Sequence, residues 1–220
     1  RMVGFWQRIV NGKQDKVSFR LYKILLAMHQ GGFFHSKWLL SIKNSLTSNG
    51  YDTVWQSQEN VPLNISKSVK LKLIEKYKHE WSELVFTTSK CLNYRIFKAE
   101  LVFEQYFHLL PDDLASAVCH FRCLNHKLPI EVGRFWGVER DDRICELCRL
   151  NKLGDEYHYL LECIYFEEQR RMYLPRDLSM RPNTTIFESI MKSKELPALF
   201  KLGKFCKEIL NTFKVIHSNW

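Results

Sequence analysis

The sequence predicts a mainly α-helical fold, and the spacing of its apolar residues carries that prediction. Apolar side chains recur every three or four positions along most of the 220 residues, and strand-like alternation is weak except over 143–153, where a short ribbon is expected. Gly and Pro are sparse, at 9 and 6, which argues against collagen-like or linker character. Apolar residues make up 45% and aromatic residues 14%, enough to bury a sizeable core.

The N-terminal part is predicted to contain three helices and one short helical turn. Helices over 17–29 and 38–46 are each followed by a turn that contains glycine, and a helical turn is expected at 52–56. The third helix is long and amphipathic, because apolar residues recur every four positions along it. These residues are Ile65, Val69, Leu73, Tyr77 and Trp81.

The rest of the chain also favours helices, with one irregular stretch. The expected helices cover 91–109, the residues from the Pro111 cap to about Leu124, 158–173, 184–192 and 197–216. Residues 125–143 are expected to be irregular, because Pro129, Gly133 and Gly137 interrupt them.

Four residues in the second half of the chain have the types and spacing of zinc ligands. Cys145 and Cys148 form a C-x2-C pair, and His158 and Cys163 follow. In a helix His158 and Cys163 lie about one and a half turns apart, so the helix must start near His158 or bend there. Three thiolates and one imidazole complete a tetrahedral Zn²⁺ site with no open position, which indicates a structural role. Zinc bound in this way stabilises small modules by about 10–16 kcal/mol.

Two other cysteines leave an alternative open. Cys119 and Cys123 lie four residues apart on a predicted helix, near His120 and His126. They could form a second metal site, but buried cysteines more often serve as small apolar side chains in a core. We expect core packing.

These features divide the chain into three expected segments. Residues 1–124 form a basic helical region, 125–175 a CCHC zinc-binding module, and 176–220 the C-terminal helices. The fold class is therefore a helical bundle followed by a small zinc-binding module and further helices.

The net charge of +9 lies mostly in the first segment. Residues 1–90 hold 14 Lys/Arg against 6 Asp/Glu, whereas 91–144 carry −1 and 145–220 carry +2. Such a surplus favours polyanions, because each neutralised phosphate releases counterions, although many soluble domains are as basic and bind none. No signal peptide or apolar run of membrane-spanning length is evident, so we expect no membrane association and an intracellular protein of the cytoplasm and nucleus.

The sequence shows no catalytic centre. The pairs Asp112-Asp113 and Asp141-Asp142 lack the strand-like flanks of polymerase aspartates. His79-Glu80 lacks the second histidine of a metalloprotease helix, and no phosphate-binding glycine loop or nucleophile signature is present.

Several stretches together resemble a known family. They are Gly12-Lys-Gln, Ser89-Lys-Cys-Leu-Asn-Tyr-Arg-Ile-Phe-Lys98, Asn125-His-Lys-Leu-Pro-Ile-Glu-Val-Gly-Arg134, Arg143-Ile-Cys145-x2-Cys148 and Gly154-Asp-Glu-Tyr-His158-Tyr-Leu-Leu-Glu-Cys163. The chain looks like the C-terminal region of non-LTR (LINE-type) retrotransposon reverse transcriptases, most specifically over 124–165.

The resemblance implies a place and a role. In that family this region follows the polymerase palm and thumb and ends in a zinc knuckle, whose ligands here would be Cys145, Cys148, His158 and Cys163. It implies binding of template RNA or target DNA during reverse transcription. The polymerase aspartates and the endonuclease would lie upstream in the same polypeptide, so this chain would be a fragment of a transposable-element protein, from an active, decayed or domesticated copy.

Candidate nucleic-acid contacts fall into two groups. The exposed side of the long helix offers Lys67, Lys70, Lys72, Lys76 and Lys78, and the surroundings of the zinc knuckle offer Arg134, Arg140, Arg143 and Arg149. A solvated helix face would explain the lysines equally well. Phe135 and Trp136 could stack on bases, but core packing is the expected fate of both.

A second class of function also remains open. The same helices and zinc ion could form a protein–protein interaction module with no nucleic acid. Salt separates the two, because phosphate binding weakens steeply with ionic strength and apolar docking does not.

Overall fold

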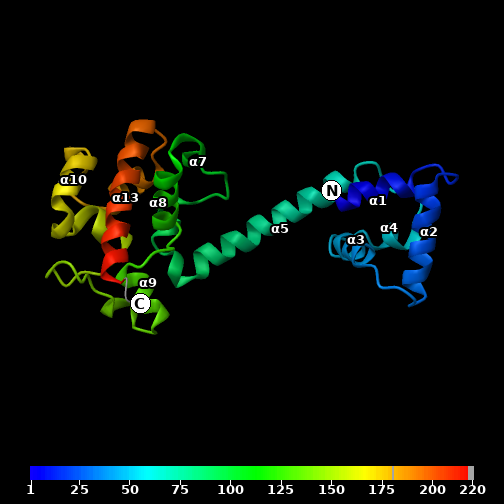
Figure 1. Ribbon diagram of the computed structural model, residues 1–220, viewed down its shortest axis with the longest axis horizontal. Coiled ribbons are helices and arrows are strands. Elements are labelled where there is room, and N and C mark those ends of the chain that lie inside the picture. The colour runs from blue at the N-terminus through cyan, green and yellow to red at the C-terminus, as the bar shows by residue number, and fades with distance from the viewer. Residues whose placement is uncertain (180, 218–220) are drawn as a thin grey trace. The chain divides into compact units, whose positions relative to one another are not determined.

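The computed structural model describes residues 1–179 and 181–217 (Figure 1). It is mainly helical, as predicted, and the described residues contain no strand, only an isolated antiparallel bridge between Ile144 and Leu153. None of the described helices is both long enough and apolar enough to cross a membrane.

The chain divides into two compact units, an N-terminal unit, Arg1–Glu80, and a C-terminal unit, Trp81–Trp220. This boundary differs from the expected segment ends at 124 and 175. The reason is that residues on both sides of those positions, such as Phe121, Leu160 and Phe205, belong to a single hydrophobic core.

The N-terminal unit is a small helical bundle. Its helices are α1 Met2–Val10, α2 Val17–Gln30, α3 Lys37–Thr47, α4 Asp52–Ser57 and the first part of α5 Ile65–Thr87. Trp6, Leu39 and Leu46 are fully buried at its centre, and Trp6 Nε1 donates to the Tyr22 hydroxyl at 2.8 Å. The predicted helices at 17–29, 38–46 and 52–56 are confirmed.

Helix α1 was not predicted, although its residues carry a helical signal. Val3, Trp6 and Val10 are spaced by three and four residues and are all buried. The stripe is short and begins at the chain's first residues.

Helix α5 is confirmed, but its apolar stripe is buried only at the two ends. Ile65 and Val69 pack in the N-terminal core, and Val85 is 4% exposed. Every residue from 71 to 80 is exposed, including Leu73 at 46% and Tyr77 at 61%. The apolar residues in the middle of this amphipathic helix are therefore not part of either core.

The C-terminal unit holds the remaining elements. They are η1 Ser89–Cys91, α6 Tyr94–Phe97, α7 Tyr106–Leu109, α8 Asp112–Arg122, α9 Pro129–Phe135, η2 Arg140–Asp142, the π-turn η3 His158–Glu162, η4 Ile164–Phe166, α10 Glu167–Tyr173, α11 Arg176–Ser179, α12 Thr184–Lys192 and α13 Leu196–Ile216. The predicted helices at 184–192 and 197–216 and the one after Pro111 are confirmed.

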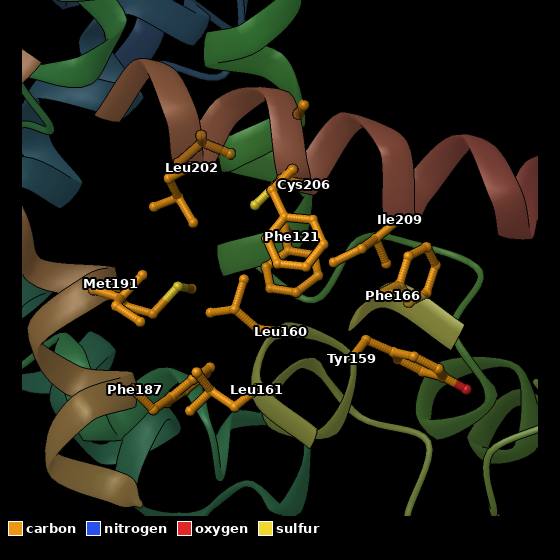
Figure 2. Packing of buried hydrophobic residues seen from close by; sticks show 14 of the residues in the cluster. Phe121, Tyr159, Leu160, Leu161, Phe166, Phe187, Met191, Leu202, Cys206 and Ile209 are labelled. Carbon is orange, nitrogen blue, oxygen red and sulfur yellow. The ribbon is translucent and has the colours of Figure 1, made fainter. Parts of the chain in front are cut away.

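Helices α8 and α13 form the framework of this unit and lie side by side (Figure 1). Gly203 permits their close approach, because a Cβ at this position would lie 3.0 Å from Leu114 Cβ. In Figure 2, Leu202, Cys206 and Ile209 of α13 face Leu160 and its neighbours on the π-turn. The turn that carries His158 is thus anchored in the core.

Three sequence expectations fail here for physical reasons. The 91–109 helix is broken, because Lys98 leaves it with φ −123° and ψ 90° and its buried Nζ donates to the Val102 carbonyl at 2.9 Å. The irregular stretch contains α9, where Pro129 sits in the first turn and needs no amide partner. The 158–173 helix is interrupted at Cys163, whose backbone is extended.

Candidate metal centre

The structure brings the four predicted ligand residues together. One ligand atom from each of Cys145, Cys148, His158 and Cys163 lies within 4.8 Å of all the others. Cys145 Sγ is 3.8 Å from Cys163 Sγ, and Cys148 Sγ is 3.4 Å from His158 Nε2. Three of the residues are buried and Cys148 is half-buried, so this group can hold a metal ion away from solvent.

A tight turn presents the first two sulfurs. The amide of Cys145 donates to the Lys152 carbonyl at 2.8 Å. The ribbon expected at 143–153 is thus reduced to a single antiparallel bridge, between Ile144 and Leu153. The amide of Leu147 lies 3.4 Å from Cys145 Sγ and donates to it. Asn151 adopts φ 50°, a conformation that asparagine tolerates better than most residues. The backbone thereby aims both sulfurs inward.

A π-turn presents the other two ligands. The Cys163 amide donates to the His158 carbonyl five residues earlier, at 2.8 Å, and Asp155 Oδ1 accepts from the His158 amide at 2.9 Å. The extended backbone at Cys163 then ends the turn. The sequence spacing required a helix that starts or bends near His158, and the structure meets that requirement with a wider turn.

The four side chains hold protons unequally. The hydrogen bond with the Cys163 thiol lowers the pKa of Cys145, and the same bond raises the pKa of Cys163. Burial raises the pKa of Cys148. Burial also opposes the charged form of His158, but Cys145 and Glu162 outweigh it and raise the pKa of that imidazole. A bound metal ion would displace these protons, so its affinity must increase with pH.

Two further residues hold the ligands in place and were missed by the sequence analysis. Glu162 Oε2 lies 3.4 Å from His158 Nδ1, which leaves Nε2 to face the sulfurs. Arg170 donates to the carbonyls of Leu160 at 3.0 Å and Cys163 at 2.8 Å. The spacing of Glu162, one helical turn after His158, is a signal that could have identified it.

A buried polar network fixes the metal-site turn to the preceding segments. Asn93 Nδ2 donates to Asp155 Oδ2 at 3.1 Å and to Glu156 Oε2 at 2.5 Å. His126 Nε2 lies 2.7 Å from Glu156 Oε1, and both side chains are almost fully buried. His126 is therefore part of the scaffold.

The alternative of a second metal site is not supported. Cys145, Cys148, His158 and Cys163 are the one group of metal-type residues that converges in the described part of the chain. His120 Nδ1 lies 2.9 Å from the Asn125 carbonyl, and Cys119 packs against the hydrophobic core. Cys123 is exposed, so core packing holds for Cys119 alone.

The five candidate lysines of α5 are all exposed but lie on two sides of the helix. Lys67, Lys70 and Lys78 share one face, as their spacing of three and eight residues requires. Lys72 lies on another side, where its Nζ donates to the Asn49 carbonyl at 2.7 Å, and Lys76 Nζ is 3.8 Å from Glu80. The first three are the best placed for a ligand.

The candidate arginines differ in what they already contact. Arg143 donates to the carbonyls of Val138 and Ile130 and supports α9. Arg134 Nη2 pairs with Glu131 at 2.8 Å. The remaining two are Arg140, which is half-buried, and Arg149, which is exposed.

The aromatic pair beside Arg134 lies on the surface. Phe135 is 78% exposed and Trp136 is 61% exposed, with ring centroids 5.3 Å apart. The expectation of core packing for these two residues was wrong, because α9 ends there and the chain turns at Gly137 with φ 70°.

No protein-family model, curated protein or solved structure matches this chain. The fold and the site by themselves define a mainly helical protein with a Cys₃His group that can hold a metal ion.

Proposed function

We propose that this chain is a zinc-stabilised, nucleic-acid-binding accessory region of a non-LTR retrotransposon reverse transcriptase, without a catalytic centre of its own. It would bind template RNA or target DNA and work with a polymerase domain upstream in the same polypeptide. The likeness of residues 124–165 to that family supports the assignment to the family. The positive charge of the N-terminal unit is the main observation in support of nucleic-acid binding.

That unit holds almost all of the chain's net charge. Residues 1–80 contain 13 Lys/Arg and 5 Asp/Glu, a surplus of 8 out of the total of 9. All 13 Lys and Arg side chains are exposed, and Lys76 pairs with Glu80 at 3.8 Å. Repulsion within so dense a set of cations destabilises the unit, and a polyanion relieves it.

Zinc is the metal that the ligand set fits best. Three thiolates with one imidazole are a soft, tetrahedral donor set. Zn–S and Zn–N bonds of about 2.3 and 2.0–2.1 Å require ligand separations of about 3.8 Å between sulfurs and about 3.6 Å between sulfur and nitrogen. The corresponding distances, 3.8 and 3.4 Å, are close to these values.

The zinc would stabilise the unit rather than react. All four tetrahedral positions are taken by protein, so no position is left for water or substrate. The ligands come from the turn at 145–148 and from the π-turn, whose leucines belong to the core. Loss of the metal would therefore loosen the centre of the C-terminal unit.

The test is zinc content and nucleic-acid binding on the same purified chain. Elemental analysis should find one zinc per chain, and fluorescence anisotropy should detect salt-sensitive binding to single-stranded RNA or duplex DNA. Replacing Lys67, Lys70 and Lys78 together by Gln should lower the slope of log affinity against log salt by about 2 on single-stranded RNA, since each phosphate contact contributes about 0.7. The matched control replaces the exposed Lys201, Lys204 and Lys214, which lie outside the N-terminal unit, and should change this slope little.

The alternative is a zinc-stabilised protein–protein interaction module. It is favoured by Leu71 and Ile74, which are 50% and 40% exposed between the lysines of the same α5 face. One zinc per chain with no binding to either nucleic acid would support this alternative and overturn the proposal.

A further inference from the structure

A second charged site lies in the C-terminal unit, in a cavity of about 490 Å³ between α6, α7 and α12. Its lining includes Phe97, Lys98, Phe103, Glu104, Tyr106 and Arg122. The cavity has the size of a pocket for a small ligand. It shares no lining residue with the metal centre or with the lysine face of α5.

The inner wall of this cavity has more buried positive charge than the protein neutralises. The side chains of Lys98 and Arg122 are only 7% and 8% exposed. Both pair with the same carboxylate, Glu104: Lys98 through Oε1 and Arg122 through Oε2 at 3.0 Å. Two buried cations with one anion leave one positive charge uncompensated, which is costly away from water.

Arg122 is also held in position for a ligand. Its guanidinium carbon lies 5.0 Å from the Phe97 ring centre and 5.2 Å from that of Tyr106, so the two rings fix the plane of the group. Among the described residues its one side-chain hydrogen bond is from Nη1 to Glu104. The other N–H donors of the fork are therefore available.

The opening of the cavity, its rim, carries further cations and an exposed aromatic ring. Lys192 and Lys194 line the cavity, and Glu100 is the one further carboxylate. Lys192 is already paired with Glu188 at 2.6 Å, whereas Lys194 is exposed. Phe103 also lines the cavity and is 64% exposed, so its ring offers a flat apolar surface next to the cations.

We propose that this cavity binds a phosphate group of a nucleotide, with Arg122 and Lys98 contacting the phosphate and Phe103 stacking on the base. An anion supplies the missing negative charge, and the guanidinium fork matches two phosphate oxygens. An aromatic ring beside a phosphate site is the arrangement that holds a base. The choice of a nucleotide as ligand rests on the proposed nucleic-acid function, but the site is separate from α5.

The test is calorimetric titration of the full zinc-loaded chain with uridine 5′-monophosphate, inorganic phosphate and citrate. Both phosphates should bind, the nucleotide more tightly, and citrate should bind more weakly. A six-nucleotide uridine oligomer with a 5′-hydroxyl distinguishes the source of the phosphate when it competes with the bound monophosphate. Displacement of the monophosphate by this oligomer indicates phosphodiesters of a strand, and no displacement indicates a free or terminal phosphate.

Variants at the rim test the site without disturbing the core. Lys194→Gln should weaken binding of the monophosphate by about two- to fivefold, the effect of one exposed charge. Phe103→Ala should remove the preference for the nucleotide over inorganic phosphate. The matched controls Lys201→Gln and Phe86→Ala replace exposed side chains outside the cavity, and these chains should bind as the unaltered chain does.

The buried arginine gives the largest effect. Arg122→Lys keeps the charge but loses the fork, and should weaken the monophosphate by about 10- to 100-fold, as expected for a lost charged hydrogen bond. No binding of either phosphate, equal binding of citrate, or unchanged binding in Lys194→Gln together with Phe103→Ala would overturn the proposal. The Lys67, Lys70 and Lys78 variant should keep nucleotide binding, so failure at one site is distinguishable from failure at the other.

Discussion

Arg170 donates a hydrogen bond of 2.8 Å from Nη2 to the carbonyl oxygen of Cys163, next to the metal-type cluster. The guanidinium is buried, and among the described residues no carboxylate lies within ion-pair distance of it. A Zn²⁺ ion with three thiolates and a neutral imidazole carries one net negative charge. Arg170 would offset that charge while holding the backbone of the ligand turn.

Replacing Arg170 by Met should therefore weaken both the fold and the metal site. The carbonyls of Leu160 and Cys163 lose their donors, which should lower the free energy of unfolding by about 2–4 kcal/mol. Zinc affinity should fall by about 10- to 100-fold, as for other partners of metal ligands. Urea unfolding and competition with a chelator measure the two effects.

The control for this variant is its neighbour. Arg171 is exposed and pairs with Glu167, also exposed, so Arg171→Met should change the stability by less than about 1 kcal/mol. Equal behaviour of the two variants would contradict the role assigned to Arg170.

Loss of one metal ligand should affect the two units differently. Cys148→Ser should release zinc and loosen residues 140–175, and the shared core extends this effect to α8 and α13. The N-terminal unit has a separate core, so its helices should stay folded. Hydrogen exchange read out by mass spectrometry should show faster exchange in 140–175 and unchanged protection in α3.

The exposed Cys123 supplies the matched control, because Cys123→Ser removes a thiol outside the cluster. It should retain one zinc and the original protection pattern. A zinc-free Cys148→Ser chain with unchanged protection over 140–175 would show that the metal does not support the fold.

The convergence of Cys145, Cys148, His158 and Cys163 could be predicted from the sequence, whereas the residues that support this group could not. Residue type and short sequence spacing indicate which side chains can share a metal ion. Cys145, Cys148 and His158 lie close together in the sequence. Asn93, which hydrogen-bonds to Asp155, lies 62 positions away in the sequence. The π-turn that carries His158 has no characteristic amino-acid pattern by which the sequence could reveal it. Such contacts follow from tertiary packing.

The helices show the same division. The helices at 17–29 and 38–46, each followed by a turn that contains glycine, were predicted well, because glycine ends a helix locally. The 91–109 stretch has a helical pattern, yet burial of Lys98 with its partner Glu104 overrides it. The exposed middle of α5 likewise depends on where the core of the N-terminal unit ends, which periodicity does not reveal.

Alkaline pH should destabilise the C-terminal unit partly through Tyr94. Burial raises the pKa of this phenol to about 12 from 10. An acid whose pKa is raised by folding contributes its full stability below the unfolded value and loses it as the pH rises through the folded value. This stability is therefore lost between about pH 10 and pH 12.

The test compares Tyr94→Phe with the unaltered chain. The difference in unfolding free energy between the two should be constant below about pH 9 and should then increase in favour of the variant. Parallel curves for Tyr94→Phe and the unaltered chain would contradict the assignment.

A glycine beneath the metal centre should tolerate no side chain. The Gly154 amide donates to the Arg143 carbonyl at 2.8 Å, and its own carbonyl accepts from Ile130 at 3.1 Å, so the backbone is fixed between the ribbon and α9. A Cβ there would lie 2.9 Å from the ring of Pro129 and 2.9 Å from the buried Tyr159 hydroxyl. Because neither neighbour can move freely, Gly154→Ala should cost about 1–3 kcal/mol of unfolding free energy, the usual effect of overpacking. The shift of Tyr159 should also reach Cys145, whose sulfur interacts with that hydroxyl, and lower zinc affinity. Urea unfolding with and without a chelator measures the change in stability and the change in zinc affinity. If Gly154→Ala matches the unaltered chain in both, the site is less tightly packed than this geometry requires.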